Sequence, residues 1–443
     1  MKKLLTLEFN ELCPDLVDRF IQQGQLPNFA KLKQQSELRE TITDATGDDL
    51  NPWIQWVDVH TGKNRDEHGI YRLNEIKKYK GTFTWDELTK QGIKSWVCGS
   101  MNASYSEKFS GRFLPDPWTQ DVAPFPSGEM NTFYNFVSQS VQGHSQAANV
   151  SSKAFLKSIL KQGVSLSTFC KLTKQVISEK FKAELSWKRA MMLDWVQFDI
   201  FKHYFRKEQP QYCTFFSNAV AHYQHHYWRD FDPQAFGLTS ADIDADKADA
   251  ILLAYKNTDK LLGEFLNLVG DDTAIIFVTA LSQEPYTESE RFYYHINSEK
   301  AFYDTFDIPS DVKYRAVMAE QFHLHANSPE QAKEIEAHLN SFELDSNEYF
   351  HVGTNKLFLV SVKENVVHVQ CRCTKEVKAE AEFSSGEQRY TFQQHFYKMN
   401  ETKAGGHNPR GIYWFKKPGG KQQLLEDVPP AQVHEDTLAY FNQ

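Results

Sequence analysis

Short apolar runs alternate with segments of helical spacing along most of the chain. Residues 4–9 form an apolar run that ends in polar residues, and residues 14–23 then carry apolar side chains at helical spacing. The order recurs at 85–98, where a helical segment and a glycine precede another apolar run. Apolar runs at 212–216 and 274–279 each follow a predicted helix and end in a polar cluster. Strands that alternate with helices predict an α/β fold with a mainly parallel central sheet flanked by helices.

Two regions depart from this alternation. Residues 151–204 are nearly continuous in helical spacing, with Ile159 and Leu166 among the apolar positions, and we expect a helical insertion there. From residue 328 a helix is followed by alternating, strand-like runs, which predict a small α+β lobe over 328–399. The expected core then consists of residues 1–150, 205–327 and 400–443.

Composition and charge limit the class of protein. The 443 residues are 41% hydrophobic and 24% charged, which is typical of a globular protein and excludes disordered, collagenous and coiled-coil chains. Lys and Arg number 49 against 58 Asp and Glu, a net charge of −9, so we expect no nucleic-acid partner.

The cysteines and the apolar segments bear on the compartment. Six cysteines are scattered over a long chain, which favours reduced, buried thiols over a disulfide framework. The apolar run near the start is cut short by Glu8, so it does not resemble a signal peptide. No segment approaches the ~20 apolar residues that a membrane span needs. We therefore expect a cytoplasmic protein without a membrane span.

Polar clusters follow the predicted strands. Since ligands of parallel sheets bind beyond the carboxyl ends of the strands, these clusters are the candidate site. They are Glu8 to Glu11, residues 48–62, Ser217 to His222, Thr279 to Gln283, and a glycine-rich loop that carries His407.

The order of these clusters along the chain is similar to that in a known family of proteins. A carboxylate after the first strand is followed by Leu26-Pro27-Asn28-Phe29, by Pro-x-x-x-Trp at 52–56, and by Thr61-Gly62 and His68-Gly69-Ile70. This order resembles the opening of the alkaline phosphatase superfamily, specifically its phosphodiesterase/nucleotide pyrophosphatase branch. The likeness covers nearly the whole chain.

The resemblance implies metal chemistry on a phosphoryl group. The family uses two metal ions, usually zinc, and a Thr or Ser nucleophile. At the first ion's positions this chain has Asn218, His222 and His407, which we expect to hold one divalent metal, zinc. At the second ion's positions it has Glu8, Leu281 and Ser282; Leu cannot ligate a metal and Ser is a poor zinc ligand, so at most one metal is expected, with Glu8 as a further ligand or a general base.

The nucleophile position also departs from the family. Alignment on Trp56 and Thr61-Gly62 places it at or beside Pro52, whose neighbours include Asn51. A covalent phosphoserine or phosphothreonine is therefore not expected. We assign catalytic roles to Glu8, Glu11 and Asn51. The expected substrate-binding residues are Asn10, Gln55 and Gln283.

Three functions remain open from the sequence. The first is a hydrolase or transferase that acts on a phosphate or sulfate ester with at most one metal. The second is a degenerate family member that binds a ligand or partner without turnover, and the third is a metal-free acid/base enzyme in the same cleft. The expected partner is a small-molecule or a glycan- or lipid-linked ester, and the helical insertion is either a lid or a surface for a homo-oligomer. His222 has a structural alternative, because it also suits packing in an aromatic-rich helix, and it lies at i,i+4 spacing from His226.

Overall fold

The described residues form two compact units. The larger comprises Met1–Ser138, Asn149–Tyr286 and Ala404–Gln443, and the smaller comprises Gln139–Ala148 and Thr287–Lys403. The computed structural model describes residues 2–73, 75–119, 121–142, 152–181, 187–287, 292–317, 321–350, 353–399 and 404–443. The expected boundaries at residues 151 and 400 lie outside these residues.

An eight-stranded sheet forms the centre of the larger unit. Its strands are β1 (Leu4–Phe9), β2 (Glu37–Ile42), β3 (Ser95–Cys98), β4 (Gly111–Leu114), β5 (Tyr212–Ser217), β6 (Ala274–Val278), β18 (Arg410–Lys416) and β19 (Gln423–Leu424), in the spatial order β19-β2-β18-β6-β1-β5-β3-β4. β1 runs parallel to β5 and β6, and β3 runs parallel to β5 and β4. β18 is antiparallel to β2 and β6. The predicted α/β class with a mainly parallel sheet is confirmed.

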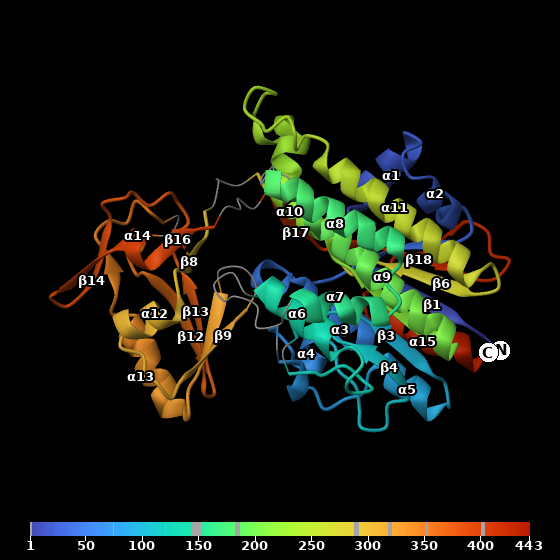
Figure 1. Cartoon of the computed structure of the whole chain (residues 1–443), viewed down its shortest axis with the longest axis horizontal. Coiled ribbons are helices and arrows are strands. Elements are labelled where there is room, and N and C mark those ends of the chain that lie inside the picture. Colours follow the sequence, from blue (N-terminus) through green and yellow to red (C-terminus); the bar gives the residue numbers. More distant parts are fainter. Residues whose placement is uncertain are drawn as a thin grey trace. The chain divides into compact units, whose positions relative to one another are not determined.

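Helices cover both faces of this sheet (Figure 1). The helices outside the predicted insertion and the smaller lobe are α1 (Pro14–Gln22), α2 (Pro27–Gln34), α3 (Pro52–Thr61), α4 (Arg65–His68), α5 (Thr84–Lys90), α6 (Asn131–Gln142), α10 (Ala219–Phe231), α11 (Ala250–Val269) and α15 (Gln432–Asn442). Trp56 of α3 and Trp85 of α5 join one apolar cluster with Phe216 of β5 and Tyr413 of β18. Side chains alternate across a strand, so the opposite face carries other aromatics. There Phe277 contacts Phe9 and Phe29 edge to face.

The described residues of the stretch predicted as a helical insertion form three helices. They are α7 (Ser152–Lys161), α8 (Leu166–Phe181) and α9 (Arg189–Glu208). α9 is built into the core, where Phe201 stacks on Trp96 of β3. α8 packs against α9 (Figure 1). Leu166, which the helical pattern placed among the apolar positions, is 76% exposed.

The smaller unit consists mainly of Thr287–Lys403, a mixture of strands and short helices that overlaps the α+β lobe predicted over 328–399. Its elements are β8 (Tyr294–Ile296), α12 (Glu299–Thr305), β9 (Lys313–Ala316), β10 (Gln321–His325), α13 (Pro329–Leu339), β11 (Glu343–Leu344), β12 (Phe358–Lys363), β13 (Val366–Cys371), β14 (Glu382–Ser385), β15 (Gln388–Thr391), α14 (Phe392–His395) and β16 (Phe396–Lys398). β9 and β10 precede residue 328 but pair into one four-stranded sheet with β13 and β12. This pairing is the reason that residues before 328 belong to the smaller unit.

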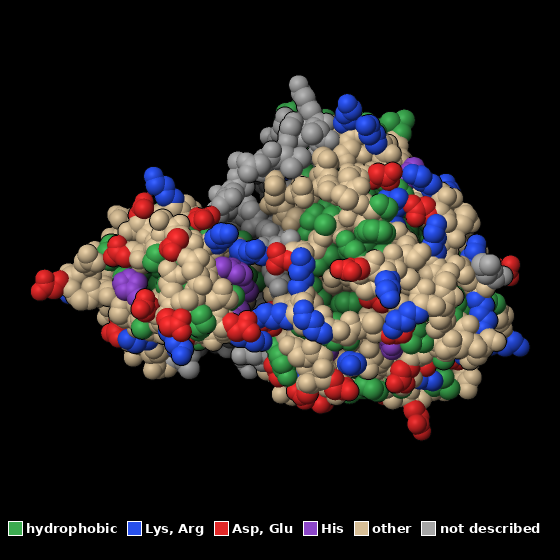
Figure 2. Space-filling model, turned by 90° about the horizontal axis from the view of Figure 1, so that it is seen from below, with side chains coloured by type: hydrophobic (Ala, Val, Ile, Leu, Met, Phe, Trp, Pro, Cys, Tyr) green, Lys and Arg blue, Asp and Glu red, His purple; other side chains and the backbone are tan. Residues whose placement is uncertain are grey.

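The surface carries charges of both signs. Figure 2 shows acidic and basic side chains interspersed over the face in view. Among the described residues, none of the helices combines the length and the apolar character that crossing a bilayer requires.

Candidate active site

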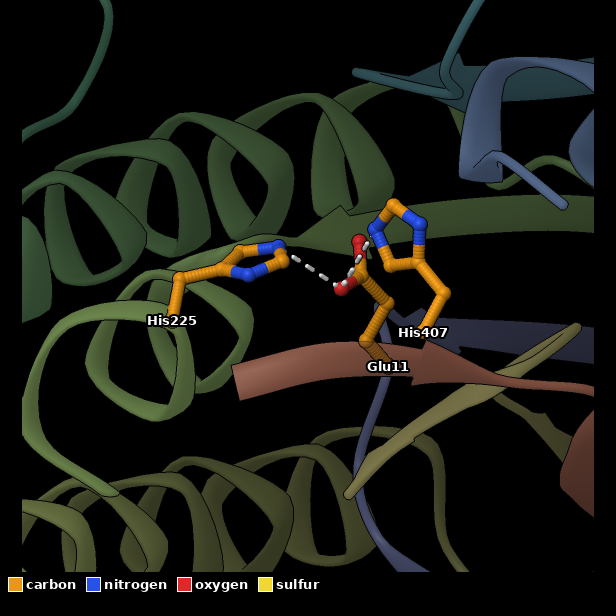
Figure 3. A group of neighbouring side chains, drawn as sticks. All are labelled: Glu11, His225 and His407. Atoms are coloured by element: carbon orange, nitrogen blue, oxygen red, sulfur yellow. Dashed lines mark ion pairs between the residues drawn. The ribbon is translucent and has the colours of Figure 1, made fainter. Parts of the chain in front are cut away.

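A cluster of polar side chains lies where the parallel strands end. Glu11 follows β1, Asn218 follows β5, and Gln283 lies in β7 (Ser282–Pro285), which comes after β6. His225 extends from α10, and His407 extends from β17 (Gly405–Asn408), which pairs with β7. Figure 3 shows the Glu11 carboxylate between the two imidazole rings. The carboxyl ends of the parallel strands therefore bring together polar side chains from four separate segments of the chain.

The backbone at Glu11 has a left-handed conformation. Its φ is +61°, which costs a residue with a Cβ free energy that the surroundings must compensate. The side chain of Gln224 donates a 2.7 Å hydrogen bond to the carbonyl oxygen of Glu11. The hydroxyl of Tyr255 donates to Gln224 Oε1 at 2.6 Å, and the backbone N–H of Cys13 donates to that hydroxyl at 2.8 Å. These buried groups fix the turn and thereby the direction of the carboxylate.

Four polar groups surround the Glu11 carboxylate. Asn10 Nδ2 donates to Oε1 at 2.7 Å, and Gln283 Nε2 donates to Oε2. His225 Nε2 lies 3.1 Å and His407 Nε2 lies 3.5 Å from the same Oε2. Burial alone raises the pKa of Glu11, but the charges of His407 and His225 and the hydrogen bonds from His225 and Gln283 outweigh it and lower the pKa to about 2. Glu11 is an anion at neutral pH.

Both imidazoles are oriented by backbone carbonyls. His225 Nδ1 lies 2.9 Å from the carbonyl oxygen of Gly405, and His407 Nδ1 lies 2.7 Å from that of Leu50. A carbonyl oxygen can only accept, so each Nδ1 carries a proton. In the neutral rings each Nε2 then directs a lone pair toward the Glu11 anion. This arrangement requires a positive charge between them, either a proton on Nε2 or a cation.

The donor set fits a divalent metal. One ligand atom each from Glu11, His225 and His407 lies within 4.8 Å of the others. Two imidazoles and one Glu form a known catalytic zinc set, and a carbonyl on the remote ring nitrogen is the usual second partner of a metal-bound His. The side chains of His225 and His407 are 21% and 12% exposed, so the site is open on the histidine side.

Gly405 permits the close approach of β17 that brings His407 into the site. A Cβ at this position would lie 2.2 Å from Gln283 Oε1 and 2.6 Å from the carbonyl oxygen of Gln224. Any larger residue would push β17 away from α10 and β7.

A second row of polar groups leads from the carboxylate to α3. Asn10 Nδ2 also donates to Asn218 Oδ1 at 2.8 Å, and Trp56 Nε1 donates to Asn10 Oδ1 at 2.7 Å. Asn51 is the N-cap residue of α3, and Gln55 in its first turn donates to the carbonyl oxygen of Asp49 at 3.2 Å. The start of α3 is tied to the site because the carbonyl of Leu50 accepts from His407.

The structure brings together five of the nine residues singled out in the sequence. They are Asn10, Glu11, Asn218, Gln283 and His407, and Asn51 and Gln55 lie at the adjoining start of α3. His222 lies outside the carboxylate cluster, and its ring packs 4.4 Å from that of His226 between centroids. The ligand roles of Asn218 and His222 stay predictions.

Glu8 lies elsewhere. It is fully buried in β1, and its Oε1 is 3.2 Å from Nε2 of the buried His60. Leu281, at one position of the family's second ion, is also fully buried.

His225 is the functional candidate that sequence reasoning missed. It lies in the stretch His222-Tyr223-Gln224-His225-His226, where the family spacing points to His222. The sequence did hold a signal for His225. It follows His222 by three residues, and residues at this spacing are neighbours on the surface of a helix. Only the position of β17 decides which ring meets Glu11.

Comparison of the sequence with known protein families gives one match over most of the chain. Residues 5–358 match the model of the family described as type I phosphodiesterase / nucleotide pyrophosphatase. No curated protein matches the chain.

Solved structures of similar proteins come from bacteria and mammals. Phosphonoacetate hydrolase from Sinorhizobium meliloti 1021, in complex with phosphonoformate, is 10% identical with a TM-score of 0.46, over 99% of this chain and 95% of that one. Murine ectonucleotide pyrophosphatase / phosphodiesterase 5 is 9% identical with a TM-score of 0.45, over 100% of this chain and 95% of that one. Because the family model covers most of the sequence, the chain belongs to the type I phosphodiesterase / nucleotide pyrophosphatase family.

Proposed function

We propose that this protein is a phosphoesterase that hydrolyses a phosphodiester or pyrophosphate bond with one divalent metal, zinc, held by Glu11, His225 and His407. The observation that carries the proposal is the convergence of two Nε2 atoms on one carboxylate oxygen, at 3.1 and 3.5 Å. Family membership supports the reaction class. The substrate class remains a small-molecule or a glycan- or lipid-linked phosphoester.

The donor set supports one metal rather than two. Among the described residues, Glu11, His225 and His407 are the one group of three His, Cys, Asp or Glu side chains close enough to share an ion. The matching positions for a second ion include Leu281, which is buried and has no donor atom.

Each neighbouring residue has a role in this proposal. A bound divalent ion would polarise a phosphoryl oxygen as a Lewis acid. Asn10 and Gln283 hold the Glu11 carboxylate by donating to its two oxygens. Asn51 and Gln55 lie at the N-terminal end of α3, where the positive end of the helix dipole favours a phosphate. These two residues are therefore on the substrate side.

The nucleophile in this proposal is water. Residues 47–56, which contain the family's nucleophile position, include neither Ser nor Thr. Attack by water on phosphorus releases the alcohol or phosphate leaving group, which takes up a proton. No phosphoenzyme forms, and hydrolysis is favoured over transfer.

A metal-free acid/base enzyme is the second candidate. It is favoured by the 3.1 Å separation of His225 Nε2 and Glu11 Oε2, which is an ion pair whenever His225 is protonated. In that case the proton takes the place of the metal as the positive charge between the two groups.

Zinc content and turnover separate these candidates. Protein purified without chelator should contain one zinc per chain by elemental analysis and should hydrolyse bis(p-nitrophenyl) phosphate. His225→Ala should lose both, and His222→Ala, three residues away on the same helix, is the matched control and should keep both. Turnover that persists without zinc but needs His225 would favour the acid/base enzyme. Zinc binding without turnover on phosphate or sulfate esters would favour the degenerate binding protein.

A further inference from the structure

Helix α8 has an unusual distribution of polar and apolar side chains. Thr168 and Glu179 are buried on its inner side, at 4% and 9% exposure. Leu166, Ile177 and Phe181 are 76%, 50% and 84% exposed. In a surface helix of a globular protein the apolar stripe normally faces the core. In α8 it faces outward.

The buried Glu179 of α8 has hydrogen-bond partners, which hold the helix in this orientation. Arg189 Nε donates to Glu179 Oε2 at 2.7 Å, and Gln175 donates to the other carboxylate oxygen at 2.9 Å. Burial of the apolar stripe would require these contacts to break.

The exposed apolar residues gather on one part of the chain. Nine large hydrophobic side chains are exposed among the described residues, and five of them lie between residues 160 and 181. Positions 166, 170, 177 and 181 recur at intervals of about one or two turns, so they form one stripe along α8. Single exposed apolar residues are ordinary, but a contiguous stripe marks an interaction surface.

The charge of this segment is opposite to that of the protein. Residues 152–181 carry six lysines and one glutamate, a formal charge of +5, whereas the whole chain carries −9. Lys174 lies next to the stripe at helical spacing and is exposed. The glutamate is Glu179, which is already paired with Arg189. The outward surface of α8 is therefore apolar with Lys174 beside the stripe, whereas Lys171 lies over the ring of Trp195.

We infer that α8 docks the protein on an anionic lipid surface. A helix with an apolar stripe flanked by lysines lies in the membrane interface, with the apolar side chains among the acyl chains and the lysines at the headgroups. Anionic headgroups attract each nearby lysine, and the attraction weakens as salt screens it. In a two-fold dimer formed through this surface, the stripe of one copy would meet that of the other, which would bring like-charged lysines together.

Cys170 provides a direct probe of this surface. It lies on the stripe and is exposed, whereas the five other cysteines are buried. The full-length protein, labelled at Cys170 with a polarity-sensitive fluorophore, is mixed with vesicles of phosphatidylcholine alone or of phosphatidylcholine with phosphatidylglycerol. The emission should shift to the blue only with the anionic vesicles, and the shift should fade at high salt.

Two sets of variants test the two parts of the surface. Ile177→Asp with Phe181→Asp should abolish vesicle binding. Lys174→Glu should lower the partition coefficient about fivefold or more. Leu424→Asp with Lys421→Glu, which changes an 82% exposed leucine on β19 and an exposed lysine that precedes this strand, is the matched control and should bind like the unaltered protein. Since all these side chains are exposed, the thermal unfolding of each variant should match the parent.

Several results would overturn the inference. They are the absence of a shift with anionic vesicles, an equal shift with neutral vesicles, and undiminished binding by the Ile177→Asp/Phe181→Asp variant. A concentration-dependent shift without vesicles, together with a dimer on size-exclusion chromatography that this variant dissociates, would assign the stripe to a second copy of the chain instead.

Discussion

Two buried glutamates three residues apart, Glu8 and Glu11, each meet a histidine but have different surroundings. Glu8 pairs with His60 inside the sheet–helix core, where the indole of Trp56 stacks on the imidazole and Trp85 packs against it. Glu8 Oε2 and His60 Nδ1 are buried and have no hydrogen-bond partner among the described residues. Glu11 instead has donors on both oxygens and two imidazoles beside it.

The difference follows from backbone position rather than residue type. Glu8 lies within β1, where side-chain alternation points it at the helix layer that holds α3 and α5. Glu11 lies past the strand end in a left-handed turn that Gln224 stabilises. A carboxylate inside the core is a structural partner, whereas one beyond the strand end is available to a ligand.

The largest expected effect concerns zinc affinity. Glu11→Gln removes the only carboxylate of the proposed donor set and should lower zinc affinity by more than about a hundredfold. Glu8→Gln is the matched change in the core and should leave the affinity within about twofold. Competition titration with a chromophoric chelator measures both. Equal losses in the two variants would break the distinction between the glutamates.

The free energy of unfolding, in contrast to zinc affinity, should depend on the Glu8–His60 pair. His60→Leu leaves the Glu8 carboxylate buried and unpaired, which should lower the free energy of unfolding by about 3–5 kcal/mol. The double variant Glu8→Leu/His60→Leu should recover most of that loss because no buried charge remains. Urea denaturation of chelator-treated protein gives the values, and zinc content should be unchanged in both variants. A His60→Leu protein as stable as the parent would contradict the structural role.

A third buried carboxylate, that of Asp194, should make the stability of the protein depend on pH. Burial raises the pKa of Asp194 to about 7, although a hydrogen bond from Ser217 opposes the rise. The pKa of Asp194 is higher in the folded protein than in the unfolded chain. The contribution of Asp194 to the free energy of unfolding is therefore fully present below about pH 4 and is lost as the pH rises through 7. The loss should be about 2–4 kcal/mol.

Asp194→Asn provides the control for this pH effect. The neutral amide should flatten the decline in stability between pH 5 and pH 8, measured by urea denaturation of metal-free protein at both values. An identical decline in the variant would show that Asp194 is ionised throughout in the folded protein.

The smallest expected effect concerns the support of Glu11. Gln224→Ala removes the hydrogen bond to the Glu11 carbonyl and should weaken zinc binding about 10–100-fold, as is typical of groups that orient a ligand. Gln234→Ala, an exposed glutamine just after α10, should have no effect. The visible spectrum of the cobalt-substituted protein should change in Gln224→Ala and not in the control. An unchanged spectrum and affinity would show that the turn holds without Gln224.

Local sequence pattern predicted the sheet well. Residues 4–9 coincide with β1, and the runs at 212–216 and 274–279 match β5 and β6 within one residue. Apolar runs bounded by polar clusters identify buried parallel strands because both faces are covered. The outward stripe of α8 was not predictable, because helical periodicity shows that an apolar face exists but not what it faces.

The site was predictable only to the level of the strand ends. Asn10, Glu11, Asn218, Gln283 and His407 were found because each follows a strand or lies in the glycine-rich loop. The choice between His222 and His225 depends on how β17 packs against α10, and Gly405 controls that packing. Such long-range contacts leave no local periodicity in the sequence.

Anomalous X-ray diffraction at the zinc edge, on crystals grown without chelator, tests the central claim most directly. One peak bounded by Glu11 Oε2, His225 Nε2 and His407 Nε2 is the predicted result. A zinc peak at Asn218 and His222, or zinc-replete crystals without a peak beside Glu11, would contradict the account.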